Sequence, residues 1–178
     1  MSTRIDIRQA VPQDAAAACS LLCRSIEVGC RADHLDQPAV LQAWLGNKTV
    51  GNVAAWFATP TNHALVAESG GALVGLCLLT QAGKLALCYV SPEALRSGVG
   101  RALLGAAEAQ ARAWSIKKLH LHSPAGASAF FERNGYVNAG KDKSCFGLEC
   151  DLLWKQLDAA AEAGAGAAAS KRFCNCNG

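Results

Sequence analysis

Residues 84–114 read KLALCYVSPEALRSGVGRALLGAAEAQARAW, and this stretch decides the fold. Its apolar run, 85–90, stops just before Pro92, which has no backbone N–H to donate to a β-ladder. Beyond Gly98, apolar residues recur at helical spacing. The stretch therefore predicts a strand, a loop and a helix, with Gly98 and Gly100 at the first turn of that helix.

The first turn of this predicted helix has the features of a phosphate-binding site. Backbone N–H groups there have no partner within the helix, and they lie at the positive end of the helix dipole. Glycines leave these groups uncovered, and Arg96 and Arg101 add positive charge beside them. We expect a ligand with phosphate groups to bind here.

Two common phosphate-binding loops fit the sequence poorly. A P-loop ends in Gly-Lys-Ser/Thr, but Gly100 is followed by Arg101 and Ala102. A dinucleotide-binding loop has a third glycine or alanine at the position that Leu103 occupies. A tight turn into an ordinary core helix would carry the same glycines, so a second motif is needed to decide.

The loop resembles motif A of the GNAT acyltransferase superfamily, which has the pattern R/Q-x-x-G-x-G/A between a strand and a helix. Gly98 and Gly100 are in register with its glycines. The first position is Leu95 instead of arginine or glutamine, and the arginine is displaced by one residue to Arg96.

A second resemblance follows downstream, where residues 123–136 read SPAGASAFFERNGY. This segment is similar to motif B of the same superfamily, and the matching residues are Ala127, Phe130, Gly135 and Tyr136. Two partial motifs in the correct order are far more specific than either alone. The chain is therefore identified as a member of the GNAT superfamily over about residues 4–157.

This resemblance implies an α/β (α+β) GNAT fold, with a mixed, mostly antiparallel central sheet of six to seven strands flanked by about four helices. Hydrophobic periodicity and turn signals predict the elements in a matching order. The predicted strands are 4–8, 63–68, 72–80, 85–90 and 118–122, followed by a last strand or hairpin over 137–154 with a turn at 140–143. The predicted helices are 14–28, 39–45, 99–114 and the motif B segment, and Asp14 is predicted to cap the first of them. The acyltransferase domain then spans residues 1–157, and residues 158–178 form an Ala/Gly-rich tail with too few large apolar residues to join a core.

The bulk composition is that of one globular domain of 178 residues, with 51% hydrophobic and 17% charged residues. A net charge of +3, without a block of lysine or arginine, gives no indication of nucleic-acid binding. No apolar run predicts a membrane span or a signal peptide, so we expect a cytoplasmic protein. The nine cysteines are predicted to be mostly buried thiols, and Cys174 and Cys176 lack further ligands for a metal.

The resemblance implies acetyl-CoA as co-substrate, with its pyrophosphate on the loop amides. It also implies that strands 85–90 and 118–122 separate after Tyr89 and Val90, so that backbone groups there hold the pantetheine arm. The residues predicted to bind acetyl-CoA are Tyr89, Val90, Arg96, Ser97, Gly98, Val99, Gly100, Arg101, Ala102, Phe130 and Arg133.

Proton transfer is where the sequence departs from the superfamily. Many members have a tyrosine near the CoA sulfur at the position of Phe131, and a glutamate in the strand that corresponds to 85–90, but this chain has neither. The candidate catalytic residues are Tyr136, Asp33, His34 and Cys88, with Ser123, Ser128, Glu27 and Asp36 as further protic or ionisable groups. Each also has a structural explanation: an aromatic core position, a buried thiol, or the polar loop 30–38. His120 and His122 share one face of a predicted strand, but no third metal ligand accompanies them.

The predicted function is direct transfer of an acetyl group from acetyl-CoA to the amine of a small-molecule or amino-acid-like acceptor. Two alternatives stay open: an acyl-CoA-binding sensor or regulatory module without turnover, and an acetyltransferase of a protein or peptide amine. A closed pocket over Asp33 and His34 would favour a small acceptor, and a groove open at both ends would favour a peptide. Members of the superfamily often form homodimers, so a homodimer is a further expectation.

Overall fold

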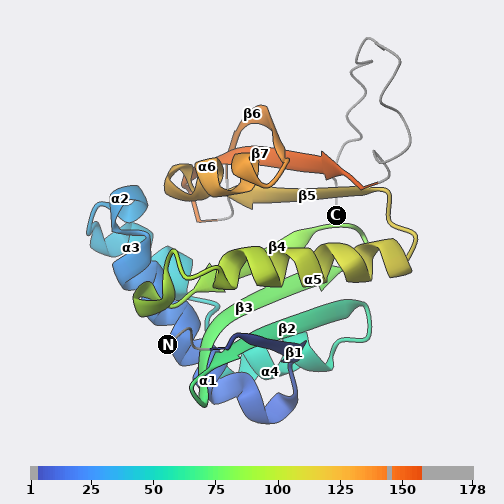
Figure 1. The fold of residues 1–178 in the computed structure, drawn as a ribbon. Coiled ribbons are helices and arrows are strands. Elements are labelled where there is room, and N and C mark those ends of the chain that lie inside the picture. Colours follow the sequence, from blue (N-terminus) through green and yellow to red (C-terminus); the bar gives the residue numbers. More distant parts are fainter. Residues whose placement is uncertain (1–3, 144–145, 158–178) are drawn as a thin grey trace.

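The strands of the computed structural model, which describes residues 4–143 and 146–157, form two antiparallel sheets (Figure 1). The first has the order β1-β2-β3-β4 and the second β5-β7-β6. Their bounds are β1 Asp6–Gln9, β2 Asn62–Ser69, β3 Ala72–Thr80, β4 Leu85–Val90, β5 Lys118–Ser123, β6 Val137–Lys143 and β7 Glu149–Gln156. The predicted fold class is confirmed, whereas the predicted tail, 158–178, lies outside the described residues.

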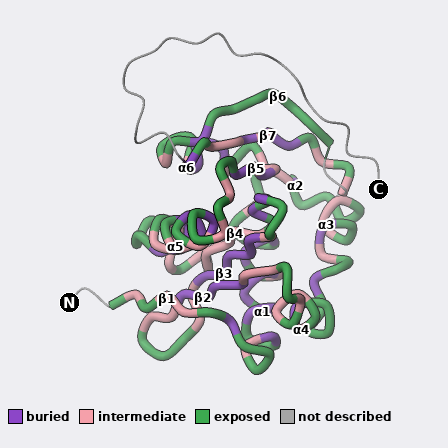
Figure 2. Tube along the Cα trace, turned by 90° about the vertical axis from the view of Figure 1, so that its right-hand side faces the viewer, coloured by how far each residue is buried: buried purple, intermediate pink, exposed green. Residues whose placement is uncertain are grey.

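Helices cover both faces of the first sheet, and Figure 2 shows these layers edge-on. The α-helices are α1 Ala15–Arg24, α2 Arg31–His34, α3 Pro38–Leu45, α4 Val50–Ala58, α5 Val99–Ala113 and α6 Ala125–Arg133, and a π-helical segment, η2 Ser25–Gly29, continues α1. One core cluster, which includes Leu103, Leu121 and Phe131, lies beneath α5 and α6. A second, which includes Leu22 and Val53, lies between the sheet and helices α1 and α4. None of the described helices is long and apolar enough to cross a membrane.

Two helices of the structure were not predicted from the sequence. Helix α4 begins at Thr49, whose hydroxyl accepts the Asn52 N–H at 3.1 Å, and it buries Val53 completely. Its β-branched, glycine and aromatic residues have weak helix propensity, so tertiary packing decides the conformation. Helix α2 occupies part of the predicted polar loop 30–38 and ends at Leu35, which has a left-handed φ of 51°.

The last section is a hairpin, but residues 140–143 belong to β6, whose Lys143 pairs with Glu149 of β7, and do not form the predicted turn. Gly140, with φ of 116°, lies within β6, where the pairing with β7 shifts between Asn138 and Lys141. A glycine in a strand often marks such an irregularity, so the signal that predicted a turn marks a β-bulge.

Within the described residues, the two sheets meet at one parallel bridge, between Lys84 and His120. Leu85 and Leu87 pair with consecutive residues of β3, so Ala86 is an extra residue in β4. Such a bulge bends the strand that contains it. From this point β4 and β5 have no further ladder between them within the described residues, so they separate from Lys84 onward and not only after Tyr89 and Val90, where the resemblance places the separation.

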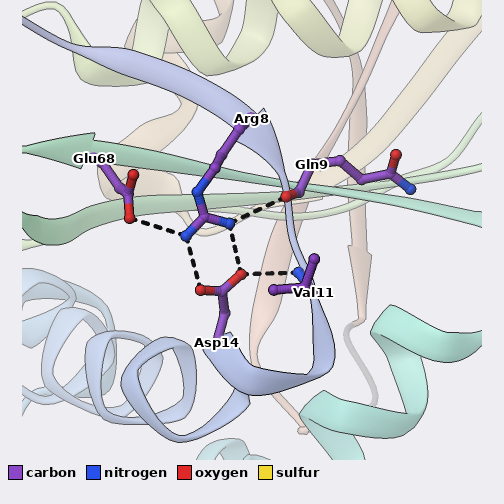
Figure 3. A network of polar contacts seen from close by, with 5 residues as sticks. All are labelled: Arg8, Gln9, Val11, Asp14 and Glu68. Carbon is purple, nitrogen blue, oxygen red and sulfur yellow. Dashed lines mark hydrogen bonds and ion pairs between the residues drawn. The ribbon is translucent and has the colours of Figure 1, made fainter.

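A network around Arg8 fastens the start of the chain to the first sheet (Figure 3). The guanidinium donates to both carboxylate oxygens of Asp14, at 2.8 and 2.9 Å, and to Glu68 of β2 at 2.9 Å. The sequence predicted that Asp14 caps α1, but its side chain does not do so. Its carboxylate accepts the Val11 N–H at 2.8 Å instead. Strand β1, strand β2 and the start of α1 are held together by this network.

Candidate functional site

The loop before α5 presents free backbone donors, as its sequence predicted. Gly98 has φ of 90° and Arg96 has φ of 63°, and these left-handed residues turn the chain into the helix. The first hydrogen bond of the helix runs from the Ala102 N–H to the Gly98 carbonyl at 3.0 Å. The amides of Val99 and Gly100 precede this bond and have no partner inside the helix. This end of α5 can bind an anion.

The two glycines of the loop have different surroundings. A Cβ added to Gly98 would meet nothing within 4 Å, so this position borders open space. A Cβ added to Gly100 would lie 3.1 and 3.3 Å from two ring atoms of Phe130. Gly100 therefore lets the aromatic side chain of α6 pack on the start of α5, while Gly98 leaves the amides accessible.

The other polar residues predicted around this loop are exposed to solvent. Arg96, Arg101 and Arg133 are exposed, and the first two lie within the loop and the first turn of α5. Ser97 is exposed too, and its hydroxyl donates to the Ala94 carbonyl at 2.5 Å. The two arginines near the free amides are therefore the positive side chains available to an anion.

The end of β4 directs backbone groups into the separation between the sheets. Ser91 donates its N–H to Val74 of β3 at 2.9 Å. Because neighbouring residues of an antiparallel strand point their polar groups to opposite sides, those of Val90 point away from β3 and toward β5. The Ser25 hydroxyl donates to the Val90 carbonyl at 3.0 Å. The Val90 N–H and the backbone of Cys88, two residues earlier, can therefore pair with an extended ligand.

Two predicted catalytic residues, Cys88 and Tyr136, pack into the core on the α5 side. Cys88 lies directly opposite Cys77 of β3, and contact with Cys88 together with burial raises the pKa of Cys77. Tyr136 is only 3% exposed and makes an edge contact with Phe131 at 5.7 Å between ring centroids. Burial, followed by the nearby Glu108 carboxylate, raises the pKa of the Tyr136 phenol. These surroundings support packing as the role of Tyr136.

The other two predicted catalytic residues, Asp33 and His34, bond to backbone. His34 is 1% exposed; its Nε2 lies 3.1 Å from the Ile26 carbonyl, and its Nδ1 accepts the Asp36 N–H at 3.0 Å. These partners place the proton on Nε2. Asp33 accepts the Gly126 N–H at 3.0 Å, near the start of α6. Both side chains thereby hold the segment between η2 and α3 in place.

An aromatic group on the other face of β4 was not predicted. Trp44 of α3 donates its indole N–H to the Tyr89 hydroxyl at 3.3 Å, and its ring stacks on Phe146 with centroids 6.2 Å apart. The Lys48 ammonium lies 4.8 Å from the centre of the Phe146 ring. Burial raises the pKa of the Tyr89 phenol. The members come from α3, β4 and the segment between β6 and β7, so no local pattern in the sequence brings them together.

The hydroxyls of Ser123 and Ser128 are also engaged. Ser123 donates to the Pro124 carbonyl at 2.9 Å, and Ser128 donates to the buried Asp151 carboxylate. Within residues 4–143 and 146–157, no group of three or more His, Cys, Asp or Glu side chains is arranged to hold a metal ion. Cys174 and Cys176 lie outside these residues.

Comparison with known proteins gives one family match. The sequence model of a family described as an acetyltransferase (GNAT) domain matches residues 34–150. No curated protein sequence is significantly similar to the chain.

Many solved structures share the fold. A GCN5-related N-acetyltransferase from Rhodopseudomonas palustris superposes with a TM-score of 0.79 at 24% identity, covering 88% of this chain and 98% of its own. The PaiA N-acetyltransferase from Thermoplasma acidophilum in complex with coenzyme A gives 0.73 at 18% identity, covering 86% and 99%. YncA from Salmonella typhimurium, solved with its cofactor acetyl-CoA, gives 0.66 at 19% identity, covering 92% and 100%.

Proposed function

The chain belongs to the GNAT acetyltransferase family, and from this premise we propose that it transfers the acetyl group of acetyl-CoA directly to a small-molecule or amino-acid-like amine. The residues present fit acetyl-CoA as co-substrate. The free amides at the start of α5, with Arg96 and Arg101 beside them, would hold the pyrophosphate. Gly98 borders open space there, and the Val90 N–H would face the pantetheine arm or the thioester carbonyl.

The observation that carries the proposal of a small acceptor is a pair of contacts beyond the end of β4. Asp33 links α2 to α6 through its 3.0 Å hydrogen bond with Gly126. Trp44 and Phe146 link α3 to the segment before β7. An extended peptide needs a groove that is open at both ends, and contacts that join α2 and α3 to the second half of the chain favour a smaller acceptor. A compact amine requires no such groove.

Direct transfer needs few groups from the protein. The acceptor nitrogen attacks the thioester carbonyl carbon, and the C–S bond then breaks. A backbone N–H at Val90 would stabilise the negative charge that develops on the carbonyl oxygen. Phe131 has no proton to donate, so we propose that the leaving thiolate takes its proton from another source.

The test combines binding with turnover. Acetyl-CoA at about 100 times its dissociation constant should stabilise the chain by about 2.7 kcal/mol, which a thermal melt detects. Thiol release is then followed on matched panels of small amines, free amino acids and short peptides. Turnover of small amines in preference to peptides supports the proposal.

The contrary outcomes separate the alternatives. Thermal stabilisation without thiol release on any panel would indicate a sensor or regulatory module. Release with peptides alone would indicate a protein or peptide acceptor. A melt unchanged by acetyl-CoA would contradict every version that includes this co-substrate.

A further inference from the structure

The reaction needs a group that takes the proton of the acceptor ammonium, and the four predicted candidates are poorly placed for it. Both ring nitrogens of His34 contact backbone groups, and Asp33 is bonded to the start of α6. Tyr136 lies in the core, and Cys88 packs on the α5 side. Of the further ionisable candidates, Glu27 is exposed and Asp36 forms a surface ion pair with Arg31, so other residues on the acceptor side are candidates for the base as well.

His122 lies on the side of the second sheet that faces away from α5 and α6. Leu119 and Leu121 point into the core beneath these helices, so His122, one position further along β5, points to the opposite face. Tyr89 points to the corresponding face of β4, away from α5, and packs against the second core cluster, which includes Leu22 and Val53. An amine that approaches from the face opposite the phosphate-binding turn would meet this side of both strands.

Its position along β5 is equally specific. The bridge between Lys84 and His120 is the point at which the two sheets meet, and β4 bends away beyond it. His122 is two residues further along β5, so in the register of this bridge it lies level with Ala86 of β4, at the start of the separation whose far end is at Val90. Under the proposed function the pantetheine arm would enter the separation at Val90, and the thioester would lie between Val90 and this start.

His122 is paired with a carboxylate. Its Nε2 lies 3.0 Å from Oδ2 of Asp142 on β6, across the intervening strand β7. The hydrogen bond to His122 is the main cause that lowers the pKa of Asp142, so this carboxylate is ionised near neutral pH. An anion at Nε2 favours the tautomer with its proton there and leaves Nδ1 as the proton acceptor. The His122 side chain is 30% exposed, so solvent and ligands can reach it.

We propose that Nδ1 of His122 accepts the proton of the acceptor ammonium, with Asp142 as the residue that positions the ring; this rests on the proposed function. The freed nitrogen lone pair attacks the thioester carbonyl carbon and displaces the thiolate as the C–S bond breaks. The imidazolium returns its proton to the thiolate, and the second proton on the amide nitrogen leaves to solvent. The carboxylate of Asp142 stabilises the imidazolium in between.

The other ionisable groups on this face distinguish His122 from its neighbour. Lys84, just before β4, and Lys118 of β5 lie near His120, and Cys150 of β7 pairs in register with Asp142. Burial, followed by the charge of Lys84, lowers the pKa of His120. His120 therefore provides a matched control on the same strand and the same face.

The experiment compares the variants His122→Ala, Asp142→Asn and His120→Ala with the wild-type chain. Thiol release is measured against pH with saturating acetyl-CoA and the best small amine from the panel, alongside the thermal shift that acetyl-CoA causes. His122→Ala should lower kcat by about 10²- to 10⁴-fold, the usual contribution of a general base, and should remove the fall in rate at acid pH. Its thermal shift should equal that of the wild type, and added imidazole should restore part of the rate.

The other two variants test the role of Asp142 and provide the control. Asp142→Asn should lower kcat less than His122→Ala does, because the imidazole base remains but loses the carboxylate that positions its ring. His120→Ala should keep the wild-type profile. If His122→Ala melts early without ligand, His122→Gln replaces it, since glutamine retains a polar side chain but cannot act as the base.

Two results would overturn the inference, and they are distinguishable. A His122 variant with the wild-type kcat and acid limb leaves the proposed function intact and removes His122 from proton transfer. A wild-type chain that binds acetyl-CoA but acetylates no amine overturns the proposed function, and this inference with it.

Discussion

Asp33 and Gly126, which are 93 positions apart in the sequence, are joined by a 3.0 Å hydrogen bond from the glycine N–H to the carboxylate. The carboxylate approaches the first turn of α6, so a residue of α2 caps the helix of motif B. Negative side chains are favourable at this end of a helix. The bond connects the part of the chain that would bind the amine to the part that would bind CoA.

We expect Asp33→Ala to destabilise the fold by about 0.5–2 kcal/mol, the usual cost of losing a helix cap. It should also raise the KM for the amine more than that for acetyl-CoA, because α2 loses its anchor on α6. Thermal melts and separate substrate titrations measure the two effects. Asp36→Ala is the control, since the Asp36 carboxylate is 64% exposed and forms a surface ion pair with Arg31. Equal KM changes for both substrates would contradict this role.

Gly98 provides a test of the phosphate-binding turn with a matched pair of variants. Asparagine and aspartate have similar shapes and are the residues that best tolerate a left-handed conformation, such as φ of 90° at Gly98. Gly98→Asp places a negative charge at the free amides, whereas Gly98→Asn does not. We expect the thermal shift with acetyl-CoA to disappear in Gly98→Asp and to persist in Gly98→Asn. Equal shifts in the two variants would rule out an anion at this turn.

The sequence was most informative where function depends on local backbone structure. The strand, loop and helix around Gly98 follow from proline, glycine and hydrophobic spacing within one stretch. The aromatic residues of motif B could likewise be located without a structure. Such features need no knowledge of which distant segments meet.

Residues that meet only after folding could not be predicted. His122 and Asp142 belong to β5 and β6, and they become neighbours although β7 lies between these two strands. Asp33 lies in the predicted polar loop 30–38, and the sequence does not reveal that its carboxylate accepts the Gly126 N–H. Helix α4 was missed because burial of Val53, and not intrinsic propensity, stabilises it.

The Arg8 network predicts that stability falls in acid. The hydrogen bond from Arg8 is the main cause that lowers the pKa of Asp14 below its ordinary value of 3.8. A carboxyl whose pKa is lower in the folded state stabilises the fold above its unfolded pKa, and this contribution is lost as pH falls through the folded value. Melting temperatures of the wild type should therefore drop steeply below about pH 4. Asp14→Asn should show a lower melting temperature at neutral pH and a shallower acid dependence, whereas parallel curves would contradict the assignment.

Two variants of Trp44 separate the effect of its packing from the effect of its hydrogen bond. The residue is 2% exposed, and its ring both stacks on Phe146 and donates to the Tyr89 hydroxyl. Trp44→Ala should lower the free energy of unfolding by about 3–5 kcal/mol, because it leaves a cavity in a buried site. Trp44→Phe keeps an aromatic ring against Phe146 but removes the donor, so we expect a smaller loss of stability with a change in preference among small amines. Thermal melts and kcat/KM across the amine panel measure these effects. If Trp44→Phe leaves the ranking of amines unchanged, the hydrogen bond between Trp44 and Tyr89 does not affect the choice of acceptor. The contact between Asp33 and Gly126 is then the remaining structural support for a small acceptor.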